Sequence, residues 1–265
     1  MSFLELSPDF KPFYEIDDYT DPWTRPQTVL FVHGFTETTE AWRAFVPHFS
    51  RRYRMIRFDL RGFGQSGAVA DDFTYSLDLF VDDMVRIINH LSPDPVHVVA
   101  GKSGGVLGVK LAAMRPDLVK TLTLACTPPK PPKTDGWIEH MEQHGMRSWA
   151  RSTMRARLGD SMPQRGIDWW VDMMGATAVS TARAYLRWVG GADVSADLKN
   201  VQCPTLVITT NLPERIKLGE IFRKGIPRAE LAALPVDGYH AAGTNPDITA
   251  KAVLDFIARH RDVGQ

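Results

Sequence analysis

The feature that most constrains the fold of this chain is a regular alternation between short apolar runs and longer amphipathic stretches. The apolar runs are rich in β-branched residues and cover residues 28–33, 54–59, 96–100, 119–126, 204–210 and 229–236. Such runs are typical of parallel strands that are covered on both faces. The stretches with helical periodicity cover residues 39–50, 76–91, 104–115, 215–225 and 246–260. The alternation predicts an α/β fold with a mostly parallel sheet and right-handed crossovers, preceded by two antiparallel edge strands near 3–7 and 13–18.

The alternation stops between residues 128 and 198. This stretch opens with the proline-rich sequence TPPKPPKTDGW, has no strand pattern and contains most of the tryptophans and methionines of the chain. We expect a helical insertion, the cap, over 128–198, and a core formed by 1–127 and 199–265. Because a helix above a binding site must turn one face toward it, some large side chains of the insertion should line a pocket. The candidates are Trp137, Met141, Trp149 and Trp188.

Charge and hydropathy narrow the class of partner. The chain has 31 Lys and Arg residues against 31 Asp and Glu residues, so its formal net charge is zero. Nucleic acids and anionic membranes select for basic surfaces, and neither is expected as a partner. No basic leader with an apolar core precedes the first strand, and no apolar run approaches ~18 residues. We therefore expect a cytoplasmic protein that acts on a small molecule, and self-association stays open.

One glycine-rich motif stands where chemistry is expected. Gly101-Lys102-Ser103-Gly104-Gly105 follows the apolar run 96–100 and directly opens the helical stretch 104–115. A nucleophile elbow needs this strand–turn–helix setting, because a strained turn lifts the serine hydroxyl off the sheet. A phosphate-binding loop would need four residues between its glycines ahead of Lys-Ser, which this motif lacks. Ser103 is the predicted nucleophile.

Two other loops supply partners for such a serine. His33-Gly34-Phe35 ends the first apolar run, and the N–H groups of Phe35 and Gly104 are the predicted oxyanion hole. His240 lies between the last apolar run and the final helical stretch, in DGYHAAGTNPD. A histidine there is the predicted general base, because its pKa near neutrality lets it take and return a proton.

Taken together, these motifs resemble the α/β-hydrolase fold superfamily. The resemblance is carried by His33-Gly34, by the stretch DLRGFGQS at 59–66, by the glycine–serine motif and by Gly238-Tyr239-His240. Within the superfamily the chain is similar to the enol-lactonase-like and small esterase branch. The resemblance implies an eight-stranded, mostly parallel sheet with helices on both faces, an inserted helical cap and a Ser-His-acid triad. We expect neither a metal nor a cofactor.

The acid of this triad is not evident. The resemblance implies an aspartate after the penultimate strand, where the chain reads PTLVITTNLPERIKLGE without one. Glu214 is the nearest carboxylate and is the predicted acid. Asn211, acting as a neutral group, or a carboxylate from elsewhere in the chain are the alternatives.

The predicted function is therefore a serine hydrolase that cleaves a small to medium carboxylic ester or lactone through an acyl-enzyme on Ser103. Three alternatives use the same frame, namely C–C bond hydrolysis, amide hydrolysis and cofactor-free oxygenation, because fold does not decide among chemistries. A fourth is a non-catalytic ligand-binding protein.

Overall fold

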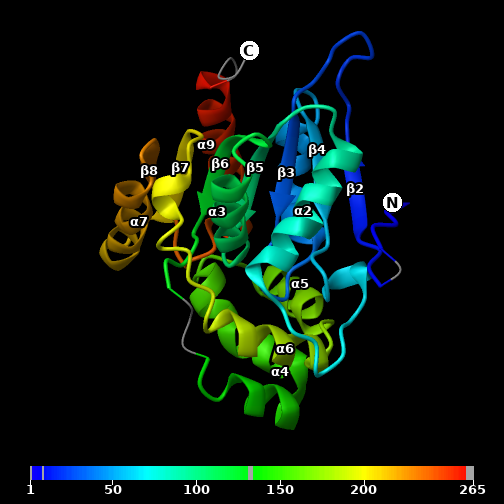
Figure 1. Ribbon diagram of the computed structural model, residues 1–265. Coiled ribbons are helices and arrows are strands. Elements are labelled where there is room, and N and C mark those ends of the chain that lie inside the picture. The colour runs from blue at the N-terminus through cyan, green and yellow to red at the C-terminus, as the bar shows by residue number, and fades with distance from the viewer. Residues whose placement is uncertain (1, 8, 131–133, 261–265) are drawn as a thin grey trace.

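A computed structural model describes residues 2–7, 9–130 and 134–260 and contains one eight-stranded sheet (Figure 1). The strands are β1 (Ser2–Phe3), β2 (Phe13–Asp17), β3 (Thr28–Val32), β4 (Arg54–Phe58), β5 (Val96–Gly101), β6 (Val119–Ala125), β7 (Thr205–Thr210) and β8 (Ala229–Leu234). Their order across the sheet is β1-β2-β4-β3-β5-β6-β7-β8. The two N-terminal strands are antiparallel and all other pairs are parallel, which confirms the predicted fold class.

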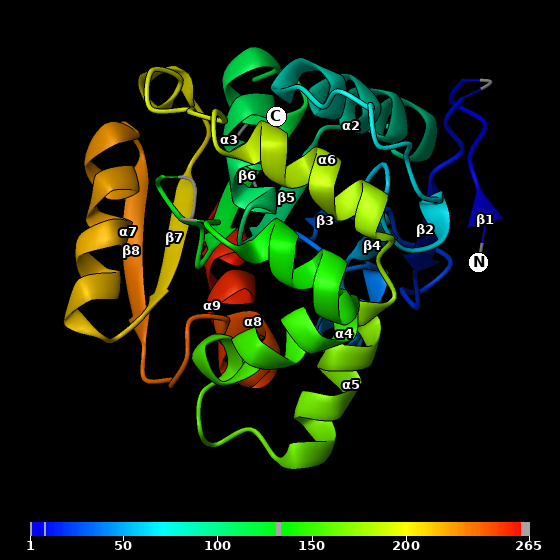
Figure 2. The ribbon, with the colours of Figure 1, turned by 90° about the horizontal axis from the view of Figure 1, so that it is seen from below.

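Helices cover both faces of the sheet. The α-helices are α1 (Val46–Phe49), α2 (Leu77–Leu91), α3 (Gly104–Met114), α4 (Trp137–Leu158), α5 (Gln164–Gly175), α6 (Val179–Val189), α7 (Pro213–Gly225), α8 (Ala241–Thr244) and α9 (Pro246–Arg259), and three 3₁₀ helices cover Thr39–Phe45, Gly64–Ser66 and Leu198–Asn200. Figure 2 shows α2 and α3 on one side of the strands and α9 on the other. Within the described ranges, no helix has both the length and the apolar character needed to cross a bilayer.

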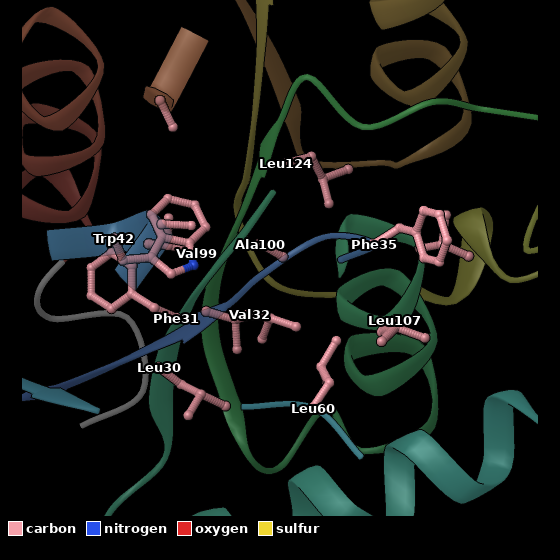
Figure 3. Packing of buried hydrophobic residues seen from close by; sticks show 14 of the residues in the cluster. Leu30, Phe31, Val32, Phe35, Trp42, Leu60, Val99, Ala100, Leu107 and Leu124 are labelled. Atoms are coloured by element: carbon pink, nitrogen blue, oxygen red, sulfur yellow. The ribbon is translucent and has the colours of Figure 1, made fainter. Parts of the chain in front are cut away.

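Side chains of the central strands alternate between the two faces. Phe31 of β3 packs at a tilt against Trp42 and edge-on against Phe49, on the α9 side. Its neighbours Leu30 and Val32 point to the opposite face, toward Leu107 of α3 (Figure 3). All of these strand side chains are fully buried, so the apolar runs of the sequence are near-continuous because both faces are covered.

Three helices lie between β6 and β7. In Figure 1, α4, α5 and α6 lie below the carboxyl ends of the parallel strands, and Figure 2 shows them in front of the sheet. Helix α4 is interrupted at Gly145, whose φ of 79° is not helical. Ligands of open α/β sheets bind at the carboxyl ends of the strands, and these helices face that end.

Candidate functional site

The turn between β5 and α3 is strained at Lys102. Lys102 has a φ of 54°, whereas Ser103 has an ordinary right-handed helical conformation with φ −65° and ψ −23°. Close packing around the two glycines that follow fixes the position of this turn. A Cβ on Gly104 would lie 2.3 Å from the carbonyl oxygen of His33, and one on Gly105 would lie 1.8 Å from Oγ1 of Thr127. The turn that holds the serine is therefore strained, but the residue with the left-handed conformation is Lys102, one position before Ser103.

Ser103 lies beside the loop that follows β3. The N–H of Phe35 donates to Ser103 Oγ at 3.0 Å, so the expected oxyanion donor points at the serine hydroxyl. Gly104 is the first residue of α3, and its N–H has no acceptor within the helix. The Phe35 ring stacks on Tyr185 of α6, with centroids 4.9 Å apart, which holds the loop against the inserted helices.

The carboxylate that contacts His240 is Glu37. His240 Nε2 lies 2.9 Å from Glu37 Oε1, and the N–H of Gly34 donates to Oε2 at 3.0 Å. Both side chains are buried, with 1% of the Glu37 surface and 3% of the His240 surface exposed. Burial alone would raise the pKa of Glu37, but attraction to His240 and these two hydrogen bonds lower it to about 2.

Glu214 and Asn211, the sequence candidates for the acid, lie elsewhere. Glu214 is in the first turn of α7, and both side chains are exposed. The expectation that Glu214 contacts His240 is therefore wrong, and the carboxylate beside His240 is that of Glu37. Glu37 and His240 are 203 positions apart in the chain, and only the fold brings them together. The one signal in the sequence is a carboxylate in HGFTE, three residues after the glycine of the loop.

Both ring nitrogens of His240 have partners within the protein. Nδ1 accepts the N–H of Gly243 at 3.0 Å, which places a proton on Nε2, and Nε2 faces Glu37. In the part of the chain that the structure describes, no hydrogen bond joins His240 to Ser103. The pair therefore ties the loop at 34–37 to the loop before α8 and leaves no imidazole lone pair facing the serine.

A cavity of about 330 Å³ opens beside Ser103 under the inserted helices. Trp137 lines it, as the sequence predicts, but Met141, Trp149 and Trp188 do not. Met141 and Trp149 are each 1% exposed, and Trp149 packs on Phe35 and Trp137. Trp188 packs on Tyr185 and Phe80, so these side chains build the protein core above the cavity instead of its wall.

Three cationic side chains line the same cavity around Tyr239. Lys102 Nζ, Arg215 Cζ and Arg157 Cζ lie 3.8, 4.8 and 5.9 Å from the centre of the Tyr239 ring. Lys102 Nζ also donates to the carbonyl oxygen of Tyr239 at 2.7 Å. Burial, assisted by the charges of Arg157 and Arg215, lowers the pKa of Lys102 from 10.5 to about 7.

The cation–π contacts with the Tyr239 ring do not offset the free-energy cost of removing these three cations from water. A cation–π contact contributes about 0.5–2 kcal/mol, whereas taking a charge out of water costs several kcal/mol. Lys102 can lose its proton near neutral pH, but the two guanidinium groups cannot. When Lys102 is neutral, its amine at the strained turn after β5 has a lone pair that can accept a proton.

Comparison with known proteins gives the family and the fold. The family model described as the alpha/beta hydrolase fold matches residues 27–164. Over 200 residues the chain is 25% identical to (E)-2-((N-methylformamido)methylene)succinate hydrolase of Acinetobacter baylyi, covering 69% of this chain and 71% of that protein. Over 80 residues it is 40% identical to "Probable oxidoreductase EphD" of Mycobacterium tuberculosis, covering 30% of this chain but 14% of that protein. The enol-lactonase from Burkholderia xenovorans LB400 superposes with a TM-score of 0.87 at 19% identity, over 97% of this chain and 100% of that one.

Proposed function

Because the chain belongs to the α/β hydrolase fold family, we propose that it is a hydrolase that cleaves a small to medium carboxylic ester or lactone. The observation that carries the proposal is the Ser103 hydroxyl, which lines the cavity 3.0 Å from the N–H of Phe35. A hydroxyl and a backbone donor side by side are what acyl transfer needs, one to attack a carbonyl carbon and the other to hold its oxygen.

In the proposed reaction, Lys102 takes the role of base that the sequence suggests for His240. A lysine beside a serine serves this purpose in other hydrolases. The neutral amine accepts the Ser103 proton while Oγ bonds to the carbonyl carbon. The N–H of Phe35 then donates its hydrogen bond to the carbonyl oxygen of the substrate instead of to Ser103 Oγ. As the acyl–oxygen bond breaks, the leaving oxygen receives the proton from Lys102. Water attacks the acyl-enzyme by the same route and frees Ser103.

His240 and Glu37 are positioning residues in this proposal. Glu37 accepts the N–H of Gly34, the residue before Phe35, so the pair fixes the loop that presents the oxyanion donor. Loss of the pair should lower kcat more than it raises KM, because the donor acts on charge that develops in the transition state.

The test is hydrolysis of 4-nitrophenyl esters by wild-type protein and by Ser103→Ala. We expect Ser103→Ala to lose at least about a hundredfold in kcat, in line with loss of a covalent nucleophile. Ser148→Ala is the matched control, because Ser148 is an exposed serine of α4 outside the cavity and should leave kcat unchanged. Turnover that survives Ser103→Ala would overturn the proposed nucleophile.

A second candidate function follows from the position of Lys102. In this fold the strained turn after the strand presents the nucleophile, and here it presents an amine with a lowered pKa. Attack of an amine on an ester would end at a stable amide, so a nucleophilic Lys102 suits a ketone or aldehyde instead. The amine adds to the carbonyl carbon, water leaves, and the protonated imine accepts the electron pair when a neighbouring C–C bond breaks.

Reduction with borohydride in the presence of levulinate, a keto acid, tests this second function. An imine on Lys102 would be reduced to a stable secondary amine that peptide mass spectrometry locates, and Lys102→Met would lack it. Absence of any adduct on wild-type protein would contradict imine chemistry while leaving ester hydrolysis untouched.

A further inference from the structure

We propose that the cavity binds a carboxylate group of its ligand at Arg157 and Arg215, beside Lys102. The inference deepens the proposed function, on which it rests in taking the ligand to be the substrate. It names the substrate class as a short acid that carries both a carboxylate and the ester or lactone carbonyl.

Arg215 is the first of the side chains that point to this ligand. It comes from α7 and reaches the cavity, where its Nε is buried and has no hydrogen-bond partner. Across residues 2–7, 9–130 and 134–260, no carboxylate oxygen lies within 4.0 Å of its guanidinium group. Arg215 as a whole is half-buried, but a buried polar atom normally has a hydrogen-bond partner, so the partner of its Nε is expected to come with the ligand.

Arg157 reaches the same cavity from α4 and is also without an anionic partner. Its side chain is nearly buried, with 6% of the residue exposed, and its Nε donates to Thr153 Oγ1 at 3.0 Å. No ion pair connects it to an acidic side chain in the described portion of the chain. Its carbonyl oxygen accepts the N–H of Tyr239, which holds it beside the ring that Arg215 and Lys102 also contact.

The charge of Glu37 acts on Lys102 and Arg157 from outside the cavity, without an ion pair to either in the described part of the chain. Neither an aspartate nor a glutamate lines the cavity among the described residues. Both oxygens of the Glu37 carboxylate already have partners. Oε1 contacts His240 Nε2, and Oε2 accepts the N–H of Gly34. A carboxylate fits the planar fork of a guanidinium by two parallel hydrogen bonds, which a neutral ester group cannot provide.

Cavity size limits how far the carboxylate is from the reacting carbonyl. The volume of about 330 Å³ is at the lower end for small-molecule sites, and Val189, Val207 and Leu218 give it apolar walls. A chain of a few methylene groups between the two ends suits such walls. Half-esters of short dicarboxylic acids have this form.

Calorimetric titration tests the carboxylate site without any turnover. Glutarate is the dianionic probe and glutaramide its neutral counterpart. We expect glutarate to bind wild-type protein and glutaramide to bind about tenfold to a hundredfold more weakly, the range for hydrogen bonds to charged groups. Arg215→Met should weaken glutarate binding by a similar factor. Phosphate that binds more tightly than glutarate would overturn the assignment to a carboxylate.

The controls separate loss of charge from loss of fold. Arg165→Met removes one positive charge from α5, where Arg165 is exposed and outside the cavity, and should leave glutarate binding unchanged. Arg215→Lys keeps the charge but loses the planar fork, and should bind glutarate with intermediate affinity. Each variant is checked by urea unfolding, and Arg157→Gln repeats the test if Arg215→Met unfolds. Equal glutarate affinity in wild-type protein and in folded variants of both arginines would refute the site.

Kinetics with two esters separate this inference from the proposed function. The substrates are mono-4-nitrophenyl glutarate and neutral 4-nitrophenyl pentanoate. Arg215→Met should lower kcat/KM for the first by a larger factor than for the second, because loss of the Arg215 charge also raises the pKa of Lys102, on which both reactions depend. If neither ester is hydrolysed but glutarate binds through Arg215, the carboxylate site stands and ester hydrolysis fails. If both esters are hydrolysed equally well and glutarate does not bind, hydrolysis stands and the carboxylate site fails.

Discussion

Glu37→Gln removes the charge from the buried pair that joins the two ends of the site. A carboxyl whose pKa is about 2 in the folded state and 4.5 as a model value contributes about 3 kcal/mol at neutral pH, since one pKa unit is worth about 1.4 kcal/mol. Glutamine can still accept from His240, but its amide nitrogen then faces the N–H of Gly34. We expect Glu37→Gln to lower the free energy of unfolding at pH 7 by about 3 kcal/mol.

The pH dependence gives this prediction its sign. The folded pKa is below the unfolded one, so the stabilisation is complete above pH 4.5 and is lost as the pH falls toward 2. Urea unfolding at pH 7 and at pH 3 should therefore show the gap between wild-type protein and Glu37→Gln narrowing in acid. Glu40→Gln is the control, because Glu40 is exposed and forms an ion pair with exposed Arg43 at 3.5 Å. A gap below about 1 kcal/mol at pH 7, the size expected for a surface ion pair, would contradict a stabilising buried charge on Glu37.

Three further predictions concern the turn after β5. Gly105→Ala places a Cβ 1.8 Å from Thr127 Oγ1 and should lower the free energy of unfolding by about 1–3 kcal/mol or more, measured in urea. Gly190→Ala, whose Cβ would meet nothing within 4 Å, should cost nothing, and equal effects of the two would contradict the packing argument. Ester turnover should rise with pH and level off above about 7, as Lys102 loses its proton, and Lys102→Arg should lack this rise because arginine stays protonated. Lys102→Met should also raise the free energy of unfolding at neutral pH. The pKa of Lys102 in the folded state lies below 10.5, so the free-energy cost of burying the ammonium is relieved only as the pH rises from about 7. No gain in stability in Lys102→Met would contradict the burial of a charge.

Much of the fold can be predicted from the sequence, because strands buried on both faces are apolar at successive positions. The runs around Leu30 and Val98 are apolar at successive positions, and in the structure both faces of β3 and β5 are covered. The N-terminal strand is the partial exception. The strand expected over 3–7 is observed only at Ser2–Phe3, where both residues are exposed at the edge of the sheet and few side-chain contacts stabilise strand pairing.

The site was less predictable, because its key relationships depend on contacts between distant segments. The glycine–serine motif locates the turn, but which residue is strained depends on where Gly104 and Gly105 pack, against His33 and Thr127. These are contacts that no local pattern encodes.

The cation cluster has the same origin. Arg157 comes from α4 and Arg215 from α7, and the two meet only at the ring of Tyr239. Periodicity describes each helix on its own, and it does not show which side chains of different helices will share a cavity.

The central claim, that Ser103 is a nucleophile activated by Lys102, is tested most directly by intact-mass and peptide mass spectrometry after treatment with a fluorophosphonate. We expect a single adduct on Ser103 of the wild-type protein, no adduct in Ser103→Ala, and slower labelling in Lys102→Met. A folded wild-type protein that stays unlabelled, or that is labelled equally fast in Lys102→Met, would contradict it.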